Sequence, residues 1–271
     1  MRWLQRGLFA FVLVLAMPAH AATTPPVFDR EHAAWSALVK KHVHWSTDGT
    51  ASSVDYPGFQ RDRVSLATYL DGLAGVSEAQ YQTWSWPDRE AFLLNAYNAA
   101  TVQLVLTRFP TLGSIKDLGS WISTPWQRPF VRLLGKTRSL DDIEHKLLRG
   151  SPDFRDPRIH FAVNCASLGC PALRDEAYVG TRLDTQLNDQ ARRFLGDRTR
   201  NRIVRASGRL QVSRLFDWYS ADFARRGGVP IFLVGYADAL DLTPGETAAL
   251  RAGRMRIDYL PYDWALNRSR P

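Results

Sequence analysis

The residues best suited to covalent chemistry lie in one short stretch, from Arg158 to Leu173. It contains both cysteines of the 271-residue chain, Cys165 and Cys170, and one of its six histidines, His160. A cysteine thiolate is a strong nucleophile once a neighbouring base or positive charge lowers the pKa of its thiol. If the protein has a chemical site, we expect it in this stretch.

In a first interpretation, Cys165 is the nucleophile of an acyl transfer or of the hydrolysis of an amide or thioester, with a histidine as its base. His160 is nearest in sequence, but five strand residues would separate the two by about 16 Å and place them on opposite faces. The chain must then turn sharply after Asn164, or His145 must act as the base instead.

Several polar side chains are candidates for orienting the acting imidazole: Asn95, Glu144 and Asp263. Glu144 is adjacent to His145 on a predicted short helix, whereas the other two are distant in sequence. The candidate catalytic set is therefore Cys165, His160, His145, Glu144 and Asn95.

In a second interpretation, Cys165 and Cys170 form a structural disulfide, which an oxidising compartment permits. The closed loop is short, so its stabilisation through chain entropy is about 2 kcal/mol. The protein would then be a non-catalytic binding or envelope-assembly module, and the question of whether it is an enzyme stays open.

Two further interpretations of the cysteines also stay open. Thiol redox chemistry is one, although four residues between the cysteines is a wider spacing than Cys-x-x-Cys. A zinc site is the other, with His145, His160, Cys165 and Cys170 as ligands. Because spacing alone favours neither strongly, we predict no metal and no cofactor.

The N-terminal residues 1–21 have the pattern of an export signal. Arg2 and Arg6 precede a short apolar run, and Ala19-His20-Ala21 fits a cleavage site. That run is too short to span a bilayer as a stable helix, and no later stretch approaches the required length. We therefore expect a periplasmic protein without an integral membrane segment after signal cleavage.

Bulk composition indicates a well-filled core and argues against nucleic-acid binding. The hydrophobic share is 45%, and 11% of residues are aromatic. The net charge of +8 comes from scattered arginines without a long basic run, and an exported protein rarely meets nucleic acid. No glycine loop for phosphate is present. An unidentified small-molecule or peptide ligand is the expected partner.

The longest predicted helix, Asp88 to Phe109, is apolar on nearly all sides at its centre and is therefore expected to be buried. Asn95, Asn98 and Thr101 lie three residues apart and form a polar line on this helix. Because an unpaired buried amide costs about 1–3 kcal/mol, these side chains need partners. The line either holds neighbouring loops in place or faces a cleft and orients catalytic groups.

The reactive stretch itself alternates in character up to Asn164. Ile159, Phe161 and Val163 are apolar, and the residues between them are polar or small. This period of two predicts a β-strand with one apolar face, followed by a loop at the small residues and the Cys-Pro pair. We therefore expect Cys165 at the tip of a strand.

Elsewhere, the pattern predicts many helices and few strands. Hairpins are expected around Gly135-Lys136 and Ser207-Gly208, and a last strand around residues 255–259. These features favour an α+β fold, a helix-rich single domain with a small, mainly hairpin-built sheet. Residues 22–55 are expected to form a leader and a first helix, and residues 56–271 one globular domain.

A specific set of motifs extends from about Tyr56 to the C-terminus. The motifs are Ala91–Ala99, Ser139–His145 with Arg149, Asp156–Ala166, Cys170-Pro171, Leu215–Tyr219 with Asp222-Phe223, and Tyr262–Trp264 with Leu266-Asn267. As a set they resemble the family catalogued as domain of unknown function 547. Because that family has no assigned activity, the resemblance implies which residues to test and not which reaction they perform.

Overall fold

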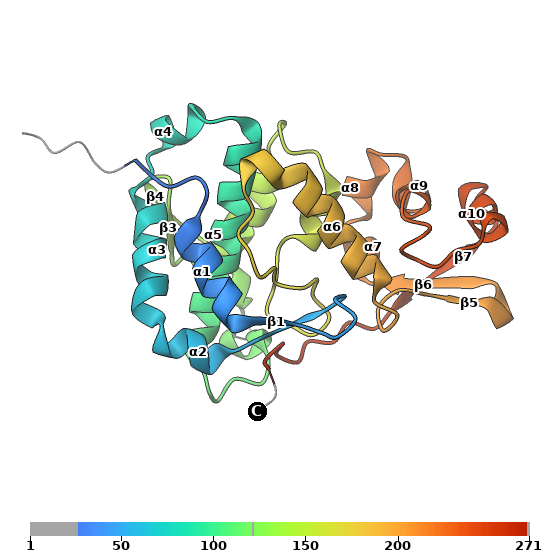
Figure 1. The fold of residues 1–271 in the computed structure, drawn as a ribbon, viewed down its shortest axis with the longest axis horizontal. Helices are drawn as coiled ribbons and strands as arrows, with labels where there is room; N and C mark the ends of the chain where they lie inside the picture. The colour runs from blue at the N-terminus through green and yellow to red at the C-terminus, as the bar shows by residue number, and fades with distance from the viewer. Residues whose placement is uncertain (1–26, 121, 270–271) are drawn as a thin grey trace, which may run out of the picture.

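The structure, a computed structural model, describes residues 27–120 and 122–269 (Figure 1). The expected export signal, residues 1–21, lies outside these ranges. Within them, helices predominate and the strands form small sheets of two or three, so the helix-rich α+β prediction is confirmed. In this part of the chain, no helix combines the length and the apolar character needed to cross a membrane.

The first half of the chain contains most of the long helices and two short hairpins. Its elements are α1 (Ala33–His42), β1 (Val43–Trp45), β2 (Ser52–Val54), α2 (Tyr56–Arg61), α3 (Arg63–Gly75), α4 (Glu78–Gln82), α5 (Trp86–Leu106), η1 (Ile115–Leu118), η2 (Pro125–Gln127), β3 (Val131–Leu133), β4 (Lys136–Arg138) and η3 (Asp142–Leu148).

The second half contains shorter helices and a three-stranded sheet. Its elements are η4 (Pro157–Phe161), η5 (Gly180–Arg182), α6 (Leu183–Gly196), β5 (Arg202–Val204), η6 (Arg205–Ser207), β6 (Arg209–Ser213), α7 (Leu215–Trp218), α8 (Ser220–Ala224), α9 (Gly228–Val234), α10 (Pro244–Arg251) and β7 (Arg256–Leu260).

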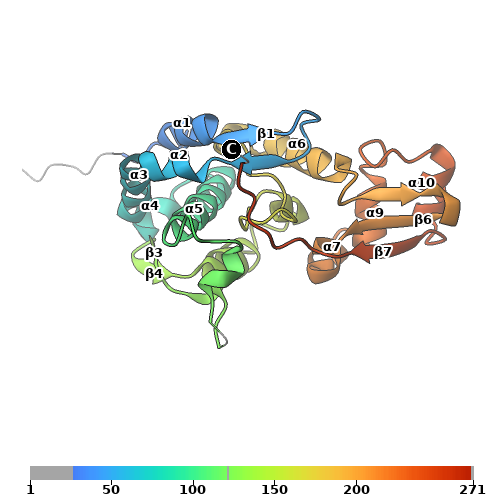
Figure 2. The same ribbon diagram turned by 90° about the horizontal axis from the view of Figure 1, so that it is seen from below.

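Two hydrophobic clusters organise these elements. The first surrounds α5 and includes the buried side chains of α1 and α3, and the second contains Phe161, Phe194, Phe216 and Phe223. Figures 1 and 2 show α1–α5 at one end of the molecule, the β5–β7 sheet with α8–α10 at the other, and α6 between them. The chain returns to the first end, where Leu266 packs in the first cluster.

Both predicted hairpins and the last strand are present. β3 pairs with β4 and β5 with β6, each antiparallel. The first turn is Leu134-Gly135, one residue before the predicted Gly135-Lys136, and the second connection contains η6 before Gly208. β7 adds to the edge of β6 in parallel, with Leu210 opposite Ile257. A parallel partner must arrive from a distant part of the chain, and here α7–α10 form that connection.

Helix α5 confirms the predicted buried helix, although it begins at Trp86 and ends at Leu106. Ser85 caps it by accepting a hydrogen bond from the Asp88 N–H, and Pro87 occupies the first turn. Nearly every side chain from Glu90 to Val105 is buried. The helix is therefore the centre of the first hydrophobic cluster.

The polar line on α5 holds neighbouring loops, as the first of its two interpretations predicts. The Asn98 amide donates to the Ala162 carbonyl at 2.9 Å and accepts from the Asn164 N–H at 2.8 Å. The Asn95 amide pairs in the same way with the carbonyl and N–H of Tyr178, at 2.7 and 3.0 Å. Each amide thus gives two backbone groups the partners that a neighbouring strand would otherwise supply.

The predicted β-strand before Asn164 is wrong. Residues Pro157–Phe161 form the 3₁₀ helix η4, which Asp156 caps by accepting from the Arg158 N–H at 2.9 Å. A capping aspartate followed by proline favours a helical start. Ile159 packs in the first cluster and Phe161 in the second. The alternation of apolar and polar residues in the sequence therefore arises because this segment packs against two cores, and not because it forms a pleated strand.

We predict that Asn98→Ala destabilises the protein by about 3 kcal/mol, because it leaves the Ala162 carbonyl and the Asn164 N–H buried and unpaired. The measurement is urea unfolding followed by circular dichroism. Gln103→Ala, a half-buried position on the same helix, is the control and should change stability by about 0.5 kcal/mol or less. Equal losses in the two variants would contradict the role assigned to the Asn98 amide.

Candidate functional site

A cavity of about 300 Å³ opens beside the two cysteines. Six phenol and indole side chains line it: Tyr97, Trp126, Trp218, Tyr219, Tyr262 and Trp264. The other lining residues are Asp141, Glu144, His145, His160, Val163, Cys165, Cys170, Pro171 and Leu215. They come from both halves of the chain, so the cavity exists only in the folded protein.

Four of the five predicted site residues meet at this cavity. Glu144 and His145 come from η3, His160 comes from η4, and Cys165 follows in the disulfide loop, residues 162–173. Asn95 is not among the lining residues, because its amide is occupied by the Tyr178 backbone. The predicted helix after Ser139 is present as η3, a π-helix, a rare form that is frequent at functional sites.

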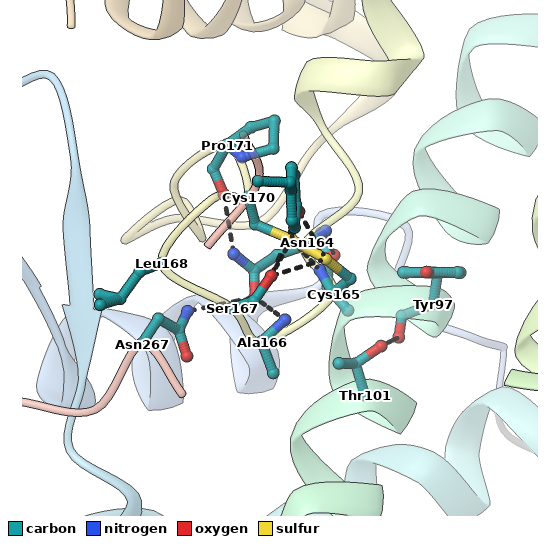
Figure 3. Close-up of a disulfide and its surroundings, with 12 residues drawn as sticks. Tyr97, Thr101, Asn164, Cys165, Ala166, Ser167, Leu168, Cys170, Pro171 and Asn267 are labelled. Carbon is teal, nitrogen blue, oxygen red and sulfur yellow. Dashed lines mark hydrogen bonds between the residues drawn. A yellow bond between two sulfur atoms is a disulfide. The ribbon is translucent and has the colours of Figure 1, made fainter. Parts of the chain in front are cut away.

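The cysteines form the disulfide of the second interpretation (Figure 3). The Tyr262 hydroxyl lies 3.1 Å from each sulfur, and the Ser167 hydroxyl lies 3.2 Å from Cys165 Sγ. Gly169 allows this close approach, since a Cβ atom there would lie 2.9 Å from the Tyr262 ring. In this bonded state Cys165 has no thiolate and cannot act as a nucleophile.

The disulfide loop is held from inside and from the C-terminal tail, residues 261–269. The Asn164 amide donates to the Pro171 carbonyl at 2.8 Å and accepts from the Ala166 N–H at 3.0 Å (Figure 3). An antiparallel bridge joins Ser167 to Leu266 of the tail. These contacts fix the positions of both cysteines independently of the bond between their sulfurs.

His160 is the best-oriented imidazole at the cavity. Its Nε2 atom lies 2.8 Å from Asp222, its ring stacks on Tyr219 with centroids 3.8 Å apart, and the residue is 2% exposed. The hydrogen bond from His160, and then the one from Arg149, lower the pKa of Asp222 below its ordinary value. Burial lowers the pKa of His160 despite this carboxylate, so the ring is neutral at pH 7.

The neutral ring of His160 has one free acceptor. Because Asp222 is ionised, Nε2 must carry the proton of their hydrogen bond, which leaves the lone pair on Nδ1. That Nδ1 atom is buried and has no hydrogen-bond partner. It is therefore the ring nitrogen of His160 whose lone pair has no partner in the structure.

Glu144 is the buried carboxylate of the cavity. Its Oε1 accepts a hydrogen bond from the Tyr219 hydroxyl at 2.7 Å. Burial, and then the charge of Glu144, raise the pKa of Tyr219 and of Tyr97, so both phenols stay protonated. Asp141 contributes a second carboxyl group whose pKa is raised by partial burial.

His145 is less suited to act as a base in this arrangement. Its Nδ1 atom lies 2.7 Å from the Arg149 guanidinium, which donates to it, and its side chain is 41% exposed. Arg149 also pairs with Asp222 at 2.6 Å and thereby joins the two histidines in one network. In residues 27–120 and 122–269, no three His, Cys, Asp or Glu side chains are grouped so that they could hold a metal ion.

Asp222, Tyr219 and the aromatic wall were not among the predicted site residues. Asp222 lies 62 residues after His160, and nothing in their spacing indicates a contact. All of them except Trp126 do occur in the motifs quoted for the resemblance, in Ala91–Ala99, Leu215–Tyr219 with Asp222-Phe223, and Tyr262–Trp264. Membership in these motifs was the one feature of the sequence that could have identified these residues.

We predict that stability falls in two steps as the pH is lowered from 7. Below 6.5, the ordinary His value, the unfolded chain binds a proton that native His160 resists. Below 3.8, the ordinary Asp value, native Asp222 resists protonation in the same way. Asp222→Asn should lower the melting temperature at pH 7. It should also reduce the loss of stability below pH 3.8.

Thermal melting at a series of pH values measures both steps. Asp71→Asn, an exposed aspartate on α3, controls for the removal of one carboxylate. A second step that keeps its full size in Asp222→Asn would contradict the assignment of that step to this residue.

Comparison with known protein families matches only the part of the chain that contains the histidines and cysteines of this site. Residues 81–195 match the family described as Protein of unknown function, DUF547. The search of curated proteins and the search of solved structures found no match. The matched segment includes α5, η3, η4 and the disulfide loop, whereas Asp222 and the tail aromatics lie beyond it. Over the segment that contains Glu144, His145, His160 and both cysteines, this chain therefore resembles the DUF547 family, whose description assigns no function.

Proposed function

We propose that this is an exported, periplasmic binding protein that holds a small ligand in the aromatic cavity, with the disulfide as a staple of the cavity wall. The observation on which the proposal rests is the combination of six aromatic side chains with a buried carboxylate around about 300 Å³. That volume is at the lower end of the range for small-molecule sites. Residues 1–21 support export, and a disulfide is expected in an oxidising compartment.

The charges around the cavity favour a small organic cation as the ligand. Glu144 and Asp141 line it, and His160 is neutral. Among the described residues no lysine or arginine lines it, and Arg149, which bonds to His145 and lies 5.0 Å from the centre of the Tyr219 ring, is paired with Asp222. Aromatic rings attract cations through their π-faces, most strongly in sites shielded from water. Lys116 already shows this attraction, since its Nζ lies 4.8 Å from the centre of the Trp264 ring.

This proposal predicts that choline binds more tightly than its uncharged isostere 3,3-dimethylbutan-1-ol, by about tenfold or more. Tryptophan fluorescence and calorimetry measure both affinities. Trp218→Ala and Glu144→Gln should each weaken choline binding, and Glu144→Gln should also reduce the preference for the charged ligand. Trp86→Ala removes another exposed tryptophan, one that does not line the cavity, and is the matched control.

The possible results separate the parts of the proposal. Equal affinity for the two isosteres would contradict the cationic ligand while leaving the binding site in place. Unchanged binding in Trp218→Ala would contradict the cavity as the site.

A second candidate function, cysteine-dependent acyl transfer or hydrolysis, is favoured by one observation. Cys165 and His160 line the same cavity, and Asp222 orients the imidazole so that its Nδ1 lone pair is free. Such an Asp–His pair is the arrangement that activates a nucleophile. The reaction requires a reduced Cys165, because only a thiolate can attack.

This candidate predicts hydrolysis of a small thioester, acetylthiocholine, only after reduction of the disulfide. Product is measured as thiocholine, after the reductant has been removed. Cys165→Ala and His160→Gln should each lower the rate by about 100-fold or more, whereas Cys170→Ala should retain it. Equal activity in oxidised and reduced protein, or in Cys165→Ala, would exclude this mechanism.

A further inference from the structure

The sulfur of Cys170 accepts a hydrogen bond that the sulfur of Cys165 lacks, from the Cys165 backbone N–H at 2.9 Å. Two hydroxyls lie within reach of both sulfurs: Tyr262 at 3.1 Å from each, and Ser167 at 3.5 Å from Cys170 and 3.2 Å from Cys165. Figure 3 shows the Cys165–Cys170 bond with Ser167 beside it. A bonded sulfur is a weak acceptor, so these contacts stabilise the disulfide only slightly.

The same donors would stabilise a thiolate on Cys170 far more strongly. Hydrogen bonds to a charged acceptor are about twice as strong as those between neutral groups, and they lower the pKa of the group that accepts them. Burial raises the pKa of Tyr262, so its hydroxyl keeps the proton that it would donate. Arg200 donates to the Cys170 carbonyl and pairs with Asp197, so it fixes the backbone of Cys170 without adding a net charge.

The two sulfurs differ in how a reagent can reach them. Both cysteines line the cavity, but Cys170 is 4% exposed whereas Cys165 is only half-buried. A thiolate that enters the cavity therefore meets Cys165 Sγ first. The leaving sulfur is then Cys170, which accepts the Cys165 backbone N–H and has both hydroxyls within reach, and a stabilised leaving thiolate speeds exchange.

We propose that Cys165–Cys170 is a redox-active disulfide that oxidises small thiols entering the aromatic cavity. The thiolate of the small molecule attacks Cys165 Sγ, and a new bond forms as the Cys165–Cys170 bond breaks. The electron pair of the broken bond stays on Cys170 Sγ as a thiolate. The intermediate is a mixed disulfide between the small molecule and Cys165.

A second molecule of the small thiol completes the reaction. Its thiolate attacks the small-molecule sulfur of the mixed disulfide and releases Cys165 as a thiolate. Two thiols have then been oxidised to one free disulfide, and the protein bridge has taken up the two electrons. The two protons that the small thiols lost return from solvent to Cys165 and Cys170 according to their pKa values.

The surroundings of the loop favour reversible opening over unfolding. The Leu168 and Gly169 N–H groups donate to the tail carbonyls of Ala265 and Asp263, both at 2.8 Å. With the Asn164 contacts, these bonds hold the loop at both ends of the bridge. The two thiols of the reduced protein would stay close enough to re-form the bond.

The test uses the folded chain, with 2-mercaptoethanol as an uncharged probe, so that its outcome does not depend on the proposed cationic ligand. The reaction is quenched with iodoacetamide at intervals, and peptide mass spectrometry locates each modification. We expect the mixed disulfide on Cys165 and the alkyl group on Cys170. Exchange in the native protein should be faster than in the same protein unfolded in urea.

The Tyr262→Phe variant tests the role of the donors. It should slow native exchange by about tenfold or more, the effect of losing one hydrogen bond to a charged acceptor. In the reduced protein, it should also move the pH midpoint of Cys170 alkylation upward, which a purely structural tyrosine would not do. Ser167→Ala should shift both quantities in the same direction, more weakly.

Tyr236→Phe is the matched control, because its hydroxyl donates to Asn188 on α6 and its ring packs in the second cluster. It should leave the exchange rate and the alkylation midpoint unchanged. Any of three results would overturn the proposal: a bridge reduced only when the protein unfolds, a mixed disulfide on Cys170, or equal rates in Tyr262→Phe and wild type.

Discussion

The structure depends on hydrogen bonds between the buried amide side chains of α5 and backbone groups that have no partner in a neighbouring strand. Buried N–H and C=O groups must be hydrogen-bonded, and the segment around Ala162 to Asn164 lies in no sheet. Asn98 supplies both missing partners there, and Asn95 supplies them for Tyr178. The Asn98 bonds hold the disulfide loop, and with it η4, against α5, and His160 and both cysteines belong to those two segments.

The second constraint is that η4 lies between two hydrophobic clusters. Ile159 packs in one and Phe161 in the other, so His160 is held between them with its ring buried. Its carboxylate partner, Asp222, comes from α8 next to the second cluster. The imidazole therefore has its hydrogen bond only when both clusters are folded, and burial keeps it neutral.

The oxidation state of the cysteines decides which chemistry the cavity can support. With the bridge closed, the cavity offers aromatic surface, a buried carboxylate and one free imidazole nitrogen, which suit binding. Cys165 and His160 line the same cavity, and the proposed nucleophilic attack would require the bridge to be open. The donors beside Cys170 would stabilise a thiolate more than they stabilise a bonded sulfur.

The sequence by itself determined the helix-rich α+β class, the buried helix α5 with its amide line, both hairpins, and four of the five residues that we predicted for the site and that meet at the cavity. These features follow from local patterns, namely apolar periodicity, caps and turn residues, which act over a few positions. Only the tertiary structure decided that Pro157–Phe161 is a 3₁₀ helix, because alternating burial between two cores has the same period as a strand. It alone brought Asp222, Tyr219 and the tail aromatics to His160 and the disulfide, because contacts across about 60 to 100 residues arise from packing that no local pattern encodes.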